Sequence, residues 1–295
     1  MSQEPVALRP PSLPPPSPAR AFPWLNLLLF ALTVLSTVFV GTFLAVQGLF
    51  GHQLPALFSG VLFSATLLLI LGTHELGHYF MARLHGVDAS LPYFIPVPFG
   101  LGTFGAFIRM RGPTPNRRAL FDVGLAGPLA GLLVAVPLFF AGLLLAPVGY
   151  SRQLFGDSIL VRMLLLVARA WRDVPQGHHL LPHPISFAAY IGLFITAVNL
   201  LPVGQLDGGH VAYALLGRRS AYLGVVTIIF LVVLGWVSGW VSWYVWAGLI
   251  FLVGVRHPPT VDDKPPLDPA RNLLGLVAMV TLLMLFAADP FPLFR

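Results

Sequence analysis

Long apolar runs recur along the whole chain, separated by shorter stretches rich in polar residues, proline and glycine. A helix that crosses a membrane needs about 20 mostly apolar residues. Runs close to that length lie at residues 24–47, 57–83, 120–146, 185–203, 220–237, 239–256 and 272–288. The fifth and sixth runs are short and only a Ser-Gly-Trp turn separates them, so they form either a tight hairpin or one irregular segment. The pattern predicts an all-α polytopic membrane protein with about six to seven transmembrane helices.

Three stretches depart from this pattern. Residues 91–112 combine glycines with aromatic and β-branched residues, which favour strands, and they predict a short re-entrant β-hairpin. Proline-rich composition predicts a disordered tail at 1–21 and a linker at 257–270. The predicted organisation is therefore the tail, a membrane domain at 22–256 with its core at about 57–215, the linker, and a last transmembrane helix at 271–295.

Composition agrees with a membrane protein, because 57% of the residues are hydrophobic and only 9% are charged, against about 25% charged in soluble domains. With so few charges, the net charge of +6 indicates basic loops on one side of a membrane rather than a nucleic-acid-binding surface. Twelve Lys and Arg residues lie on the side of the N-terminus and five on the other, which predicts a cytoplasmic N-terminus. The absence of cysteine excludes disulfides, thiolate ligands and a cysteine nucleophile.

Polar residues interrupt the second apolar run at His74, Glu75 and His78. The two histidines are four residues apart, so both imidazoles project from one helix face, as in zinc sites where the adjacent glutamate is a general base. A charged residue at the centre of a membrane helix costs about 2.5–3.5 kcal/mol on insertion scales, and such residues are usually functional. This stretch therefore predicts a metal site inside the membrane.

A catalytic zinc ion needs a third protein ligand. Asp207 is the best candidate, because it follows the helix-breaking residues Pro202 and Gly204, and broken backbone at membrane depth lines a wet cavity or is buried in protein. Asp122 is the competing candidate, although a carboxylate at the start of the third run is also explained by the helix N-terminus. His210 is a further alternative, with a supporting or surface role as its simpler explanation.

Gly127 and Gly131 are spaced four residues apart in the third run, a pattern that lets two helices approach closely. This spacing predicts packing against the helix that carries His74 and His78. Self-association of the chain is the alternative.

At these residues the chain resembles the site-2 protease family of intramembrane zinc metalloproteases. The resemblance covers about residues 70–215 and rests on the His-Glu-x-x-His motif, the stretch from Asn199 to Gly208, the sequence GTFGAF at 102–107 and AGPLAG at 126–131. The loop at 147–184 is too short for the PDZ domain of many members, so the chain resembles the short form. The resemblance implies one Zn²⁺ per chain held by His74, His78 and Asp207, with Glu75 and Asn199 as catalytic residues and Gly102, Thr103, Phe104 and Gly105 as substrate-binding residues.

The function implied is an intramembrane endopeptidase that cleaves transmembrane segments of single-span or polytopic proteins within the lipid bilayer. An exposed hairpin strand would pair with the unwound substrate, and no nucleic acid is expected as a partner. A metal transporter and a catalytically silent binder are the alternatives; the absence of repeats argues against the first and the intact Glu75 against the second. Arginine-rich composition predicts the plasma membrane of a prokaryote, with the site opening to the cytoplasm. The sequence leaves the oligomeric state open.

Overall fold

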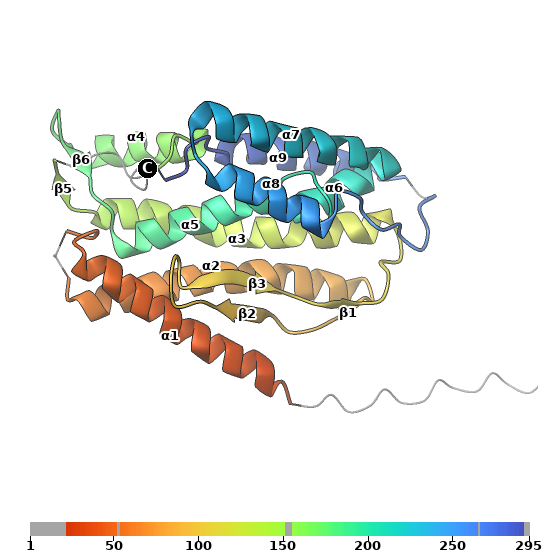
Figure 1. Ribbon diagram of the computed structural model, residues 1–295, viewed down its shortest axis with the longest axis horizontal. Helices are drawn as coiled ribbons and strands as arrows, with labels where there is room; N and C mark the ends of the chain where they lie inside the picture. The colour runs from red at the N-terminus through yellow and green to blue at the C-terminus, as the bar shows by residue number, and fades with distance from the viewer. Residues whose placement is uncertain (1–21, 52–53, 151–154, 265, 292–295) are drawn as a thin grey trace, which may run out of the picture.

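The helices of the chain lie along one long axis and stack in layers (Figure 1). The computed structural model describes residues 22–51, 54–150, 155–264 and 266–291, so the predicted tail at 1–21 lies outside the described residues. The α-helices are α1 (Trp24–Val46), α2 (Ala56–Leu84), α3 (Arg117–Leu145), α4 (Ile159–Trp171), α5 (Pro184–Asn199), α6 (Asp207–Leu216), α7 (Ser220–Ser238), α8 (Ser242–Val253) and α9 (Pro269–Leu285). The short elements are β1 (Asp88–Ala89), β2 (Tyr93–Pro96), β3 (Thr103–Phe107), β4 (Met110–Arg111), β5 (Val148–Gly149), β6 (His179–Leu180) and the 3₁₀ turn η1 (Gly217–Arg219).

Four stretches of helix are long and apolar enough to cross a membrane: α1, α2, α3 and the stretch Asp207–Ser238, which joins α6, η1 and α7. The predicted count of six to seven spans is not confirmed. The other three predicted spans correspond to α5, α8 and α9, which have 16, 12 and 17 residues. At 1.5 Å per residue these helices are about 18–26 Å long, which is less than a bilayer core of about 30 Å.

The helix α5 is short because the backbone breaks between Asn199 and Asp207, and Figure 1 places this break well inside the stack of helices. Two glycines at the start of α6 make room for it. A Cβ atom at Gly208 would lie 1.9 Å from the carbonyl oxygen of Leu200, and one at Gly209 would lie 2.4 Å from that of Gly204. The glycine pair therefore lets the broken segment fold back against the first turn of α6.

The predicted hairpin is present. It follows α2 in the chain and lies between α1 and α2 in space (Figure 1). Strands β2 and β3 are antiparallel, with Tyr93 opposite Phe107, and the register is irregular between Phe94 and Pro96. The shorter strands β1 and β4 pair at its base. Within the described chain β3 pairs only with β2, so its other edge is open.

Helix α1 holds this hairpin through polar side chains. The side-chain amide of Asn26 donates to the carbonyl oxygens of Leu91 and Pro92 at 3.0 and 2.9 Å. The hydroxyl of Ser36 donates to the carbonyl oxygen of Gly102 at 2.7 Å. A Cβ atom at Gly102 would collide with α1, so glycine permits this close approach.

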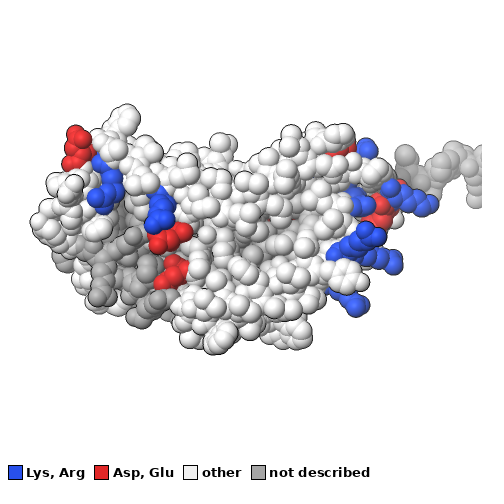
Figure 2. All heavy atoms as spheres, turned by 90° about the horizontal axis from the view of Figure 1, so that it is seen from above, with Lys and Arg blue, Asp and Glu red and all other residues white. Residues whose placement is uncertain are grey.

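Basic residues gather at one end of the molecule, at the right of Figure 2. The loops at this end join α2 to α3, α6 to α7 and α8 to α9 (Figure 1). We refer to it as the charged end. It carries Arg83, Arg109, Arg111, Arg117, Arg118, Arg218, Arg219, Arg256, Lys264 and Arg271.

Candidate metal centre

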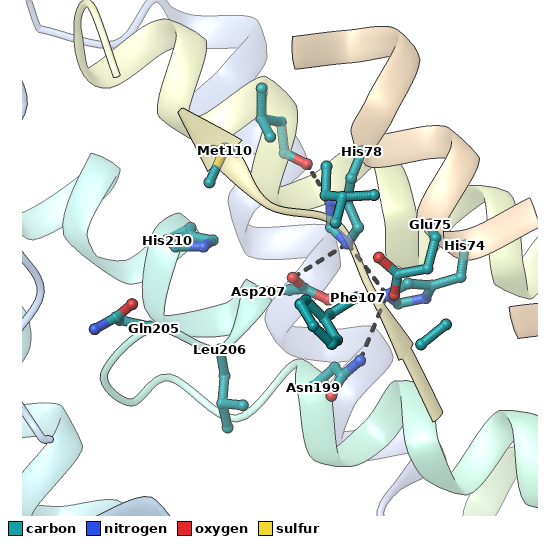
Figure 3. Close-up of a pocket in the computed structure, with 13 residues that line it drawn as sticks. His74, Glu75, His78, Phe107, Met110, Asn199, Gln205, Leu206, Asp207 and His210 are labelled. Atoms are coloured by element: carbon teal, nitrogen blue, oxygen red, sulfur yellow. Dashed lines mark hydrogen bonds and ion pairs between the residues drawn. The ribbon is translucent and has the colours of Figure 1, made fainter. Parts of the chain in front are cut away.

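Helices α2 and α6 bring His74, His78 and Asp207 together at the break in the α5–α6 segment (Figure 3). His74 Nε2 lies 3.1 Å from Asp207 Oδ2, His78 Nε2 lies 3.2 Å from Asp207 Oδ1, and the two Nε2 atoms are 3.2 Å apart. Both histidines are buried, with exposed fractions of 4% and 6%. His74 lies ten residues before the end of α2 at Leu84, which corresponds to a depth of about 15 Å.

Helix α3 fixes the orientation of the imidazoles of His74 and His78. His78 Nδ1 lies 2.7 Å from the carbonyl oxygen of Val123. Because a carbonyl can only accept, Nδ1 carries the proton and Nε2 of the neutral ring keeps its lone pair. A Cβ atom at Gly127 would lie 2.1 Å from His78 Nε2, and one at Gly131 would lie 3.2 Å from His74 Nδ1. The predicted packing of this glycine pair against the helix with the two histidines is therefore confirmed.

The three ligand atoms fit a zinc ion. Two atoms bound to one tetrahedral zinc at roughly 2.0–2.2 Å lie about 3.3 Å apart; here the two Nε2 atoms are 3.2 Å apart and each lies 3.1–3.2 Å from one of the two oxygens of Asp207. Two imidazole lone pairs and a carboxylate converge on one point, and no Lys or Arg of the described chain pairs with Asp207. A buried carboxylate without a compensating charge is unfavourable, so this donor set calls for a cation.

Glu75 and Asn199 border the same space (Figure 3). Glu75 is 7% exposed and lines this space. Asn199, the last residue of α5, has its side-chain Nδ2 3.4 Å from His74 Nε2. Both residues that the sequence singled out for catalysis thus lie within reach of a group held by the three ligands.

A cavity of about 220 Å³ contains the three ligand residues and Glu75. One wall is the end of β3 and the residues after it, and another is the broken segment between α5 and α6 (Figure 3). Sequence reasoning missed most of these wall residues, because the hydropathy pattern gives no signal for them. They include Ala106, Phe107, Ile108, Met110, Gln205 and Leu206.

The predicted substrate-binding residues lie earlier on the same strand. Thr103 is buried and donates to the carbonyl oxygen of Ile95 on β2, whereas the side chain of Phe104 is 72% exposed. Gly105 has a φ of +98°, which only glycine adopts readily. Gly102 packs on α1, and none of these four residues lines the cavity.

The two alternative ligands take other positions. Asp122 bonds to His85 and Arg271 at the charged end and does not join the cluster of ligand atoms. His210 lines the cavity, but its Nδ1 lies 2.6 Å from His257 Nε2. Burial lowers the pKa of His257, which keeps that ring neutral. In the structure, Asp207 therefore belongs to the group of potential ligands, and Asp122 and His210 do not.

The family described as Peptidase family M50 matches residues 62–237, which include every residue of this centre. The chain belongs to this family. The resemblance to site-2 proteases is thereby confirmed. No solved structure matches this M50 peptidase.

Curated relatives of this M50 peptidase carry similar names. The probable zinc metalloprotease EGY1, chloroplastic, of Oryza sativa subsp. japonica is 34% identical over 216 residues, covering 70% of this chain and 37% of the relative. The probable zinc metalloprotease EGY2, chloroplastic, of Arabidopsis thaliana is 32% identical over 231 residues, covering 76% and 40%. The chain thus spans about two fifths of the length of these relatives.

The predicted location in a prokaryotic plasma membrane is wrong. The relatives are named as chloroplastic plant proteins, which contradicts that location. An arginine-rich composition misled the prediction, because codon and amino-acid usage carries no physical information about the compartment.

Proposed function

We propose that this M50 peptidase is an intramembrane zinc endopeptidase that cleaves transmembrane segments of single-span or polytopic membrane proteins. One observation carries the proposal: two histidine Nε2 atoms 3.2 Å apart, each within 3.1–3.2 Å of one oxygen of the same aspartate, share a buried cavity with a glutamate, about halfway along a stack of apolar helices. His74, His78 and Asp207 are the proposed ligands of one Zn²⁺, and Glu75 is the proposed general base.

The proposed residues divide the chemistry of peptide hydrolysis among them. A bound zinc ion supplies Lewis acidity, which activates water and polarises a peptide carbonyl. Glu75 takes a proton from the attacking water and delivers it to the leaving amine. The side-chain amide of Asn199 donates a hydrogen bond where negative charge develops on the substrate oxygen. The buried walls of the cavity strengthen each of these interactions, because they lower the local dielectric constant.

The open edge of β3 is the proposed docking place for the substrate. A transmembrane helix keeps its peptide bonds in internal hydrogen bonds, so the segment must unwind before it reacts. Added as a strand along β3, an unwound segment would satisfy its backbone groups and pass the cavity wall at Ala106, Phe107 and Ile108. Gly102 to Gly105 would then bind the more distant part of the segment.

The proposal also includes six to seven membrane crossings. Helix α5, the break and α6 together would form one of them, because a broken helix is tolerated at membrane depth when it lines a cavity. The relatives are also named as zinc metalloproteases, which agrees with the proposed activity.

The test uses the full chain in proteoliposomes with a reporter protein that has one transmembrane segment. We expect mass spectrometry to find the cut inside that segment, with cleavage lost after zinc chelation and restored by added zinc. Cleavage confined to soluble loops of the reporter, or unaffected by chelation, would overturn the proposal.

A zinc-flux assay in the same vesicles addresses the transporter alternative. The described residues contain one group of three ligands that could hold a metal ion, and no second group along a path across the membrane. We therefore expect no zinc uptake above that of empty vesicles.

A further inference from the structure

A second polar cavity, of about 460 Å³, lies at the charged end between the start of α7 and the segment that follows α8. Cavities of this size are typical of small-ligand sites. The residues lining it that matter here are Tyr213, Arg218, Ser220, Tyr222, Arg256 and His257. The chemistry of the proposed peptidase uses none of them.

Two arginines of this cavity lack an acidic partner. Arg83, Arg111 and Arg271 at the same end form ion pairs with aspartates. Arg218 and Arg256 form no ion pair within the described parts of the chain, although both line one cavity. Two guanidinium groups that converge without a carboxylate create a site for an anion, and the planar fork of arginine matches phosphate oxygens in particular.

The nearby carboxylate of Asp263 already has hydrogen-bond partners of its own. It accepts hydrogen bonds from Tyr213 at 2.8 Å and from Thr260 at 2.6 Å. Burial alone would raise the pKa of Asp263, but these two hydrogen bonds and the charge of Arg117 outweigh it and lower that pKa. Asp263 is therefore ionised, and its charge is stabilised by groups other than Arg218 and Arg256.

A hydroxyl group is available as a further donor. Ser220, the first residue of α7, is 7% exposed. Its side chain has no hydrogen-bond partner among the residues that the structure describes, yet it borders the cavity. An unpaired hydroxyl beside two unpaired arginines is the donor set that a phosphate group needs.

The surroundings favour a phosphate that belongs to a lipid. Next to the cavity, the side chain of Tyr222 is 76% exposed, and aromatic side chains of this kind gather at the membrane–water boundary. Apolar side chains continue from there along the outer faces of α7 and α8: Val226 is 60% exposed, Ile229 57% and Leu252 81%. Acyl chains can lie along these faces while the headgroup occupies the polar cavity.

We propose that this cavity binds the phosphate of an anionic phospholipid through Arg218, Arg256 and Ser220. Basic pockets between transmembrane helices are known to hold such headgroups. His257 gives the site a connection to the metal centre, because it lines this cavity and contacts His210, which lines the other. A bound lipid would hold the segment between α8 and α9 in place.

Binding can be tested without any protease assay. The full chain in a neutral detergent is titrated with short-chain phosphatidylglycerol or phosphatidylcholine, and bound lipid is counted by native mass spectrometry. We expect preferential binding of phosphatidylglycerol. Each substitution, Arg218→Gln or Arg256→Gln, should weaken that binding roughly fivefold, since one basic residue contributes about that factor at an anionic surface. Equal binding of the two lipids by the unchanged protein would overturn the proposal.

Arg219→Gln is the matched control, because Arg219 is the neighbouring exposed arginine of η1 and does not line the cavity. We expect this variant to bind phosphatidylglycerol as tightly as the unchanged protein. An equal loss in the control would show a diffuse charge effect and no built site. Inorganic phosphate is the competitor that separates the two sources of phosphate: displacement of the lipid at equal concentration would overturn the lipid assignment in favour of free phosphate.

Discussion

Two clusters of histidine and aspartate draw their histidines from α2 or the residue just after it, but their charges are arranged differently. In the first, Asp207 of α6 lies between the Nε2 atoms of His74 and His78. In the second, Asp122 of α3 contacts His85 at 2.9 Å and Arg271 through two hydrogen bonds of 2.8 and 2.6 Å. The second aspartate therefore has an arginine partner, and the first has no Arg or Lys partner among the described residues.

The difference explains why only one cluster suits a metal. The bidentate pair with Arg271 uses both carboxylate oxygens of Asp122, which leaves little capacity for another cation. Arg271 lies in α9 and Asp122 in α3, so the second cluster joins α9 to the core of the molecule, while the pair of Arg271 with Asp268 stays within the start of α9. The first cluster brings two imidazole nitrogens and a carboxylate together without an arginine or lysine partner, an arrangement that a bound cation would stabilise. Histidine and aspartate alone therefore do not indicate a metal site; among the described residues, the lack of an arginine partner distinguishes Asp207 from Asp122.

Substitution of Glu75, which lines the same cavity as the first cluster, gives the largest expected effect on cleavage. Replacing its carboxylate by an amide of the same shape (Glu75→Gln) removes the group that accepts the proton. We expect cleavage of the reporter in proteoliposomes to fall roughly 100- to 10,000-fold, the usual contribution of a general base, while zinc content stays unchanged. Cleavage at the original rate would remove Glu75 as the base.

Replacing each of the two aspartates by asparagine, one at a time, tests the comparison directly. Asp207→Asn removes a charged candidate ligand, and we expect zinc affinity to drop at least about 100-fold. Even the loss of a group that only supports a ligand by a hydrogen bond lowers metal affinity about 10–100-fold. Asp122→Asn should leave zinc affinity unchanged. Metal analysis of both purified variants, with a competing chelator, measures this. Full zinc retention by Asp207→Asn would direct attention to His210 as the third ligand.

Asp122→Asn, which should leave zinc affinity unchanged, should instead lower the stability of the protein. Asp122→Asn leaves Arg271 without its bidentate partner, and hydrogen bonds to charged groups contribute about 1.5–3 kcal/mol each. We expect the free energy of unfolding to fall by about 2 kcal/mol, seen as a lower Tm of the zinc-loaded protein. His85→Gln removes only the weaker contact and serves as the smaller comparison. An unchanged Tm in Asp122→Asn would mean that the second cluster does not hold α9.

The sequence singles out His74, His78 and Asp207 as candidate ligands, and the structure brings these three residues together. The spacing of His74 and His78 depends only on helix geometry, and glycine and proline around Asp207 mark a break that any fold must accommodate. The sequence favours Asp207 but does not exclude Asp122, because Arg271 lies 149 residues away from Asp122 in the chain. Only the tertiary arrangement shows which carboxylate that arginine reaches.

The span count and the strand residues were harder to predict. Leu200, Leu201 and Val203 continue the apolar run of α5, so hydropathy extended a helix that ends at Asn199. The hairpin was predicted at residues 91–112, and its strands lie there. Which residues of β3 reach the cavity depends on the irregular register, which composition does not encode.

Gly127 allows the comparison to be sharpened by a change outside both clusters. A methyl group at this position would lie 2.1 Å from His78 Nε2, and the hydrogen bond to Val123 prevents the ring from moving away. We expect Gly127→Ala to weaken zinc binding about tenfold, in the range seen when the support of a ligand is disturbed. Gly248→Ala in α8 is the matched control, because no atom lies within 4 Å of the added methyl group. Alanine favours helix by about 1 kcal/mol at either position, so helix propensity cannot cause the difference in zinc affinity. Equal zinc affinity of the two variants would show that α3 does not set the position of His78.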